Sequence, residues 1–151
     1  MKGLTQRVWE RLQGVTSLSF VACSSAPEKT GWTGEANGMV DVQRPSSGCL
    51  HFVESGAWST PQGKRTEFSN IYRWTLLGHG IRLEHLRFGP DRPVHLVDFV
   101  PVERNRMGSE TPHVCSADLY RAWLDLDENV RLSWSITGPR KRETIVCRYS
   151  R

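Results

Sequence analysis

The hydrophobic pattern of the chain begins with a helical period. Leu4, Val8 and Leu12 recur every fourth residue, so they line one face of a helix over residues 2–14. Gly14 follows them and is a residue type that commonly ends helices. We therefore expect a short N-terminal helix with one apolar face, suited to closing an end of the domain that follows.

After Gly14 the period falls to two, because apolar and polar side chains alternate as they do in strands with one buried face. The positions predicted to face inward are Leu18, Phe20, Ala22, Trp32, Gly34, Ala36, Gly38, Val40, Val42, Leu50, Phe52, Glu54, Gly56, Trp58, Tyr72, Trp74, Leu76, Ile81, Leu83, His85, Val94, Leu96, Asp98, Val100, Val130, Leu132, Trp134, Ile136, Ile145, Cys147 and Tyr149.

Two segments do not follow this simple alternation. In residues 113–126, Leu119, Trp123 and Leu126 fit a helix, whereas an alternating set that starts at Tyr120 fits a strand equally well. Residues 102–112 are charged and form the longest predicted loop, which is either a mobile lid or an inert connector.

The spacing of turn residues decides the fold class. Turn signals such as Pro61–Gly63 and Gly138–Pro139 separate the strands at hairpin distance. A parallel sheet needs a helix between successive strands, and the chain has no room for one. Many strands are better protected in a closed barrel, which has no edges. We predict a mainly β fold: an antiparallel up-and-down barrel of about eight to ten strands, large enough for one small ligand.

In this interpretation residues 1–14 cap a single barrel domain of residues 15–151. The chain of 151 residues carries 20 basic and 16 acidic side chains, a formal charge of +4, and no basic stripe of the kind that binds nucleic acid. No apolar run approaches the roughly 20 residues of a membrane span. We expect a cytoplasmic monomer or homodimer without a membrane span, whose partner is a small molecule rather than a nucleic acid.

The four cysteines are Cys23, Cys49, Cys115 and Cys147, and no two of them form a C-x-x-C motif. Zinc ribbons and thioredoxin-type sites use that motif, so neither is expected. A chain of this length can fold without disulfides, and we predict free thiols.

Glu54 is the most informative candidate for function. Its neighbours on the same strand face are Leu50, Phe52, Gly56 and Trp58, so its carboxylate is expected inside the barrel. Burying a carboxylate is costly unless it is partnered. It is either a ligand-orienting group, a general base with a raised pKa, or one half of a structural ion pair with Arg73 or Arg148.

A second cluster consists of His113, Cys115, Asp118 and Tyr120. In an extended segment His113 and Cys115 share a face, where they can hold a metal, form a nucleophile pair or line a pocket. A zinc site needs more ligands at tetrahedral distance than this segment offers. We therefore expect no metal site and assign the cluster to the ligand pocket.

The remaining candidates are aromatic or basic. The predicted inward aromatics Tyr72, Trp74, Trp134 and Tyr149 either stack on a flat ligand or pack the core. Lys141 follows the Gly138–Pro139 turn and, together with Arg151, either holds an anionic group or faces solvent.

Several motifs carry a resemblance to known barrels. Gly31-Trp32-x-Gly34 resembles the entry motif of calycin-type barrels, the superfamily of lipocalins and fatty-acid-binding proteins. A fuller set resembles a family of small bacterial calycin-like barrels without assigned function: Glu54-x-Gly56, Tyr72-x-Trp74, His113-x-Cys115-x-x-Asp118-x-Tyr120, Trp134, Gly138-Pro139-x-Lys141 and Tyr149-x-Arg151.

This resemblance implies a barrel and no particular activity. Nitrobindin-like haem barrels also begin with this type of glycine-tryptophan motif, and they place the iron-ligating histidine in the C-terminal part of the barrel. Here no histidine follows His113, so we expect no haem. We also predict no other cofactor.

The leading functional prediction is a barrel that binds one small hydrophobic or aromatic ligand with a polar or acidic group. Glu54, Arg73, Tyr120 and Tyr149 would orient that ligand. Two alternatives remain. One is an enzyme for a small hydrophobic substrate with Glu54 or His113 as acid or base. The other is an interaction module whose barrel is filled by its own side chains and which exposes an apolar patch.

Overall fold

The computed structural model describes residues 2–24 and 33–151, and the predicted Gly31-Trp32 motif lies outside them. The elements in chain order are α1 (Leu4–Gln13), β1 (Ser17–Ser24), β2 (Gly34–Ser46), β3 (Cys49–Ser59), β4 (Arg65–Leu76), β5 (Ile81–His85), β6 (Val94–Glu103), β7 (Arg106–Ser109), β8 (His113–Cys115), β9 (Asp118–Leu126), β10 (Val130–Thr137) and β11 (Arg142–Ser150).

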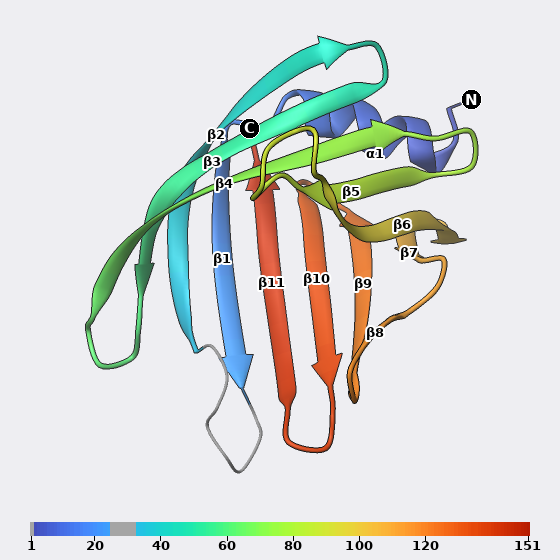
Figure 1. Cartoon of the computed structure of the whole chain (residues 1–151). Helices are drawn as coiled ribbons and strands as arrows, with labels where there is room; N and C mark the ends of the chain where they lie inside the picture. The colour runs from blue at the N-terminus through green and yellow to red at the C-terminus, as the bar shows by residue number, and fades with distance from the viewer. Residues whose placement is uncertain (1, 25–32) are drawn as a thin grey trace.

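The strands form a closed antiparallel barrel, which confirms the predicted fold class. The order β10-β11-β1-β2-β3-β4-β5-β6-β7-β9 closes on itself through the pairing of β9 with β10. Strand β8 pairs with β9 and stands outside this ring. Figure 1 shows long, curved β2, β3 and β4 on one side of the barrel and the straighter β1, β11, β10 and β9 on the other.

Helix α1 lies across one end of the barrel, near the end of β11 (Figure 1). Its buried face consists of Leu4, Val8, Trp9 and Leu12, which join the core inside the barrel. This is the apolar stripe that the sequence predicts. Among the described residues no helix is long and apolar enough to cross a membrane.

The interior is filled near the helix and hollow farther away. At the helix end Phe52, Trp74, Phe99, Met107 and Leu124 are fully buried and occupy the barrel centre. Within the part of the chain that the structure describes, the prediction of a completely filled barrel is therefore wrong, because a cavity of about 440 Å³ occupies the remaining length.

Most of the predicted inward faces are found, but a β-bulge changes one of them. Between β5 and β6, Leu83 pairs with Val97 while the next residue of β5 pairs with His95, so Leu96 is inserted without a partner. An extra residue reverses the alternation beyond it. Consequently Phe99 faces inward, and the predicted inward placement of Asp98 and Val100 is wrong.

Both segments that depart from the simple alternation consist mostly of strands. In residues 118–126 the strand interpretation holds, with Ala122 and Leu124 buried as alternate residues of β9. The predicted loop at 102–112 is wrong over most of its length, because β6 extends to Glu103 and β7 follows after a tight turn. Ser109 Oγ exchanges hydrogen bonds with the backbone of Ala122 in β9, which makes this segment part of the barrel wall.

The close approach of β2 to β3 requires two facing glycines. Gly38 and Gly56 are direct partners in the β2–β3 register. A Cβ atom on Gly56 would lie 2.7 Å from Gly38 Cα and would overlap the Asn37 carbonyl oxygen. Both are backbone atoms, so relief would require the strands to separate.

We therefore expect Gly56→Ala to lower the free energy of unfolding by about 1–3 kcal/mol, the usual range for overpacking. Urea denaturation followed by tryptophan fluorescence measures this change. The matched control is Gly78→Ala, because a Cβ at Gly78 would meet nothing within 4 Å. An equal loss in both variants would contradict the steric argument.

Candidate functional site

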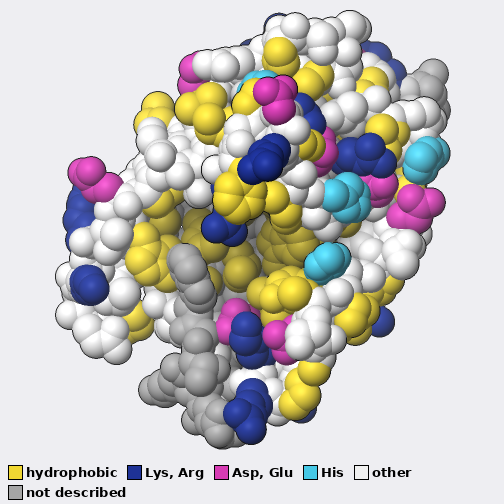
Figure 2. Space-filling model, viewed as in Figure 1, with side chains coloured by type: hydrophobic (Ala, Val, Ile, Leu, Met, Phe, Trp, Pro, Cys, Tyr) yellow, Lys and Arg dark blue, Asp and Glu magenta, His cyan; other side chains and the backbone are white. Residues whose placement is uncertain are grey.

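The hollow part of the barrel is a cavity of about 440 Å³. Strands β1–β6 and β9–β11 each contribute at least one side chain to its lining, so it runs along the barrel axis beyond the filled end. Most of its walls are apolar, and in Figure 2 it opens as a hollow with largely hydrophobic walls. A cavity of this size is typical of a site for one small organic molecule.

Glu54 is the acidic residue of the described cavity lining, and that lining contains no Lys or Arg. The alternation of β3 points its side chain inward, and only 4% of its surface is exposed. The Tyr149 hydroxyl on β11 donates a hydrogen bond of 2.6 Å to Glu54 Oε2. Glu54 lines the cavity, and its Oε1 has no hydrogen-bond partner among the described residues.

Burial controls the protonation of Glu54. Loss of solvent raises the pKa of this carboxyl to about 7, against the weaker lowering effect of the Tyr149 hydrogen bond. Close to neutral pH the carboxyl thus exists in both its protonated and its ionised form. This property permits either charge pairing with a ligand or proton transfer.

The other titratable groups near Glu54 are neutral around pH 7. Burial raises the pKa of Tyr72, Cys147 and Tyr149, and the Glu54 charge raises each of them further. The His85 ring stacks on Tyr72 with 4.7 Å between ring centres, and burial lowers the pKa of this histidine. Glu54 is consequently the source of negative charge in the cavity.

The structure brings together the predicted site residues Glu54, Tyr72, Tyr120, Trp134 and Tyr149, all of which line the cavity. It also adds lining residues that the sequence analysis did not select for the site. The sequence pattern places His85 and Cys147 on inward faces but does not mark them as site residues. Asn70 was missed, although it continues the alternation of the Tyr72 face by one step toward the start of β4.

Trp74 belongs to the core rather than to the cavity. Its ring is fully buried and packs against Phe52, Phe99 and Tyr149, with ring centres 5.8–6.4 Å apart. Of the two alternatives for this predicted aromatic site residue, core packing is the one that the structure shows.

Arg73 is not in the cavity, and the predicted ion pairs of Glu54 are wrong. Arg73 lies between two inward residues of β4 and therefore points outward, where its Nε donates to Glu84 Oε1 at 3.0 Å. Arg148 is exposed on the outer face of β11. The tyrosine hydroxyl, rather than either guanidinium, partners the buried carboxylate.

The predicted cluster around residues 113–120 is divided between the outside and the cavity. His113 and Cys115 are exposed on β8, although the His113 and Tyr120 rings form an edge-to-face pair with ring centres 5.8 Å apart. Asp118 forms an ion pair of 3.6 Å with Lys141. Within the described parts of the chain, no group of three or more metal-ligating side chains is gathered.

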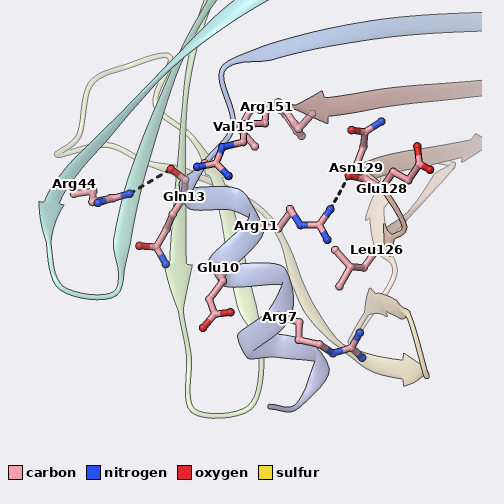
Figure 3. Close-up of a pocket in the computed structure, with 12 residues that line it drawn as sticks. Arg7, Glu10, Arg11, Gln13, Val15, Arg44, Leu126, Glu128, Asn129 and Arg151 are labelled. Atoms are coloured by element: carbon pink, nitrogen blue, oxygen red, sulfur yellow. Dashed lines mark hydrogen bonds between the residues drawn. The ribbon is translucent and has the colours of Figure 1, made fainter. Parts of the chain in front are cut away.

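A second hollow, of about 740 Å³, lies beside helix α1 (Figure 3). Arg11 donates to the backbone carbonyls of Asp127 and Glu128, and Arg44 donates to that of Gln13. These hydrogen bonds connect helix α1 to the turn after β9 and to strand β2, and so hold the helix against the barrel. Arg151 also lines this hollow, a full length of β11 away from Lys141, so the predicted joint clamp of Lys141 and Arg151 is wrong.

Comparison with known proteins places the chain in a family. A model described as a family of unknown function, DUF6314, matches residues 16–151. The chain belongs to this family. The match covers the barrel from the residue before β1 to the last residue, so the cavity of this DUF6314 protein lies wholly within the family's shared region.

Two further comparisons describe its relation to other proteins. No curated protein matches this DUF6314 chain. Among solved structures, a de novo designed fluorescence-activating β-barrel is similar over 99% of this chain and 100% of its own, with 12% sequence identity and a TM-score of 0.43.

Proposed function

We propose that this DUF6314 barrel binds one small, largely apolar or aromatic molecule through a polar group that contacts Glu54. The observation that carries this proposal is a cavity of about 440 Å³ whose apolar walls surround one buried carboxylate. Apolar walls with a few convergent polar groups are the usual composition of a ligand pocket.

The incomplete partnering of Glu54 supports this proposal. A buried carboxylate has roughly four positions that accept hydrogen bonds. Tyr149 fills one of them, and no other described residue donates to Glu54. A ligand that donates a hydrogen bond to Oε1 would compensate part of the free-energy cost of burying the Glu54 carboxylate.

A neutral apolar probe tests the proposal. We expect N-phenyl-1-naphthylamine to bind with one equivalent and to gain fluorescence on leaving water. Ala36→Trp should reduce its affinity at least tenfold, because Ala36 lines the cavity and the added indole ring would occupy it. Met39→Trp is the matched control, since Met39 lies on the same strand and is 64% exposed.

Circular dichroism first establishes that both tryptophan variants are folded. Equal probe affinities in the two folded variants would contradict binding in the cavity, and so would the absence of probe binding by the parent protein.

The pKa of Glu54 favours a second candidate, an enzyme acting on a small hydrophobic substrate in the same cavity. A carboxyl with a pKa of about 7 is well suited to general acid–base catalysis at neutral pH. Mass spectrometry of compounds recovered after incubation separates the candidates. A binding protein returns its ligand unchanged, whereas an enzyme converts it and loses that conversion in Glu54→Gln.

Further parts of the proposal rest on sequence. Residues 1–14 cap a barrel domain of residues 15–151, and the protein acts as a monomer or homodimer without a cofactor or a nucleic-acid partner. Its calycin-like affiliation and bacterial source are supported by the motif resemblance. A cytoplasmic location is supported by four cysteines that are all free thiols in the structure.

A further inference from the structure

The charge distribution of the cavity selects against acidic ligands. Its described lining contains Glu54 but no Lys or Arg, and burial keeps His85 from gaining a proton near pH 7. Arg73, which was expected to face the ligand, is paired with Glu84 on the outer face. A ligand carboxylate would therefore meet a like charge in a poorly solvated space, which is strongly unfavourable.

The same lining is well suited to a cation. Among the described residues, seven phenylalanine, tyrosine and tryptophan side chains line the cavity: Phe20, Trp58, Phe68, Tyr72, Tyr120, Trp134 and Tyr149. The faces of aromatic rings attract ammonium groups, and the attraction grows when the cation loses its water. Rings alone would also accept a neutral molecule, so the carboxylate is needed to make the preference for positive charge strong.

Hydrogen-bonding capacity points in the same direction. A primary ammonium group has three donors and no acceptor. Glu54 Oε1 has no protein donor among the described residues, and Asn70, the direct register partner of Glu54 on β4, also lines the cavity and supplies an amide oxygen. The acceptors that an ammonium group needs are thus grouped on adjacent strands.

We propose that the natural ligand of this barrel is a hydrophobic or aromatic amine, bound as its ammonium cation with the charge against Glu54. This inference rests on the proposed ligand-binding function and names its chemical class. The aromatic rings hold the apolar part of the amine, and the carboxylate selects its charge.

The proposal predicts that affinity depends on pH. The other titratable groups of the described cavity lining are Tyr72 on β4, His85 on β5, Tyr120 on β9, and Cys147 and Tyr149 on β11. Because Glu54 has a pKa of about 7 in the ligand-free barrel, most of it is protonated at pH 5.5 and most is ionised at pH 8. An alkylammonium group stays charged over this range. Its affinity should therefore rise at least tenfold from pH 5.5 to pH 8.

The decisive experiment compares three molecules that share one ring system: tryptamine, a cation; 3-ethylindole, its neutral analogue; and indole-3-propionate, an anion. Isothermal titration calorimetry at pH 8 with the full chain measures each affinity. We expect tryptamine to bind at least tenfold more tightly than 3-ethylindole and indole-3-propionate to bind most weakly.

Variants connect this preference to one side chain. Glu54→Gln keeps the shape of the side chain and removes its charge, so tryptamine and 3-ethylindole should then bind within threefold of each other. Glu67→Gln removes an exposed carboxylate from β4 and should leave the preference unchanged.

The outcomes separate the two proposals. If 3-ethylindole or indole-3-propionate binds as tightly as tryptamine, the proposal that the ligand is an amine is overturned, while the proposed ligand-binding function stands. If none of the three binds and N-phenyl-1-naphthylamine also fails to bind, the proposed function itself is overturned. If the naphthylamine binds and tryptamine does not, the amine assignment alone is wrong.

Discussion

Replacing Glu54 with glutamine is expected to make this barrel more stable at pH 8, by about 3 kcal/mol. The variant retains a carbonyl oxygen that can accept the Tyr149 hydrogen bond, and it no longer places a negative charge in an apolar cavity. The magnitude follows from a rise in pKa from 4.5 to about 7, since each unit corresponds to about 1.4 kcal/mol.

The direction of the pH dependence follows from proton binding. Between pH 4.5 and pH 7 the folded state keeps the Glu54 proton while the unfolded state releases it. The stability that this proton provides is fully present below pH 4.5 and is lost as pH rises through about 7. The parent protein should therefore lose stability relative to Glu54→Gln over that interval, and the two should be similar at pH 4.5.

Urea unfolding of both proteins from pH 4.5 to pH 8 measures this difference. The quantity to compare is the difference in unfolding free energy between the two proteins at each pH. Burial lowers the pKa of His51 and His85, so these histidines add stability to both proteins as pH rises, and their effect cancels in the difference. The control Glu67→Gln alters an exposed carboxylate, and its unfolding free energy should change with pH as that of the parent does. A difference between parent and Glu54→Gln that does not change with pH would show that Glu54 titrates normally.

Replacement of Trp74 with alanine is expected to have the largest effect on stability, a loss of about 3–5 kcal/mol. The ring is fully buried at the filled end of the barrel and packs against Phe52, Phe99 and Tyr149. Its removal leaves a void that three neighbouring rings cannot close. The Trp74 indole N–H has no hydrogen-bond partner among the described residues, so the loss is one of packing.

Trp134→Ala is the matched comparison, because Trp134 is half-buried and lines the cavity. We expect it to cost about 1–2 kcal/mol and to weaken tryptamine binding, through loss of an aromatic wall. Urea unfolding and calorimetry on both variants give the two quantities. Equal stability losses would contradict the division of the barrel into a filled and a hollow part.

Several features of the fold follow directly from local sequence patterns. The i, i+4, i+8 spacing of Leu4, Val8 and Leu12 predicts the helix and its buried face, because local geometry fixes both. Alternation likewise predicts that Glu54 and Tyr149 face inward. The same alternation requires Arg73, between Tyr72 and Trp74, to face outward, and the prediction that it orients a ligand overlooked this consequence.

Other features depend on contacts between distant residues. The extra residue at Leu96 is visible only when β5 and β6 are paired, so a strict period of two misplaced Asp98 and Val100. Strand β7 has few apolar residues and gains its hydrogen bonds from β6 and β9, which made it appear to be a loop.

The sequence by itself determined the class of fold, the helix at one end and a carboxylate on an inward face, because local periodicity specifies these properties. Only the tertiary structure decided that the hydroxyl of Tyr149, which is 95 residues away in sequence, lies 2.6 Å from Glu54 Oε2. It also decided which inward aromatics pack and which enclose space, as the contrast between Trp74 and Trp134 shows. The reason is that barrel closure brings together strands that are distant in sequence. The sizes and positions of the inward side chains that then meet determine which part of the interior is filled and which part stays open.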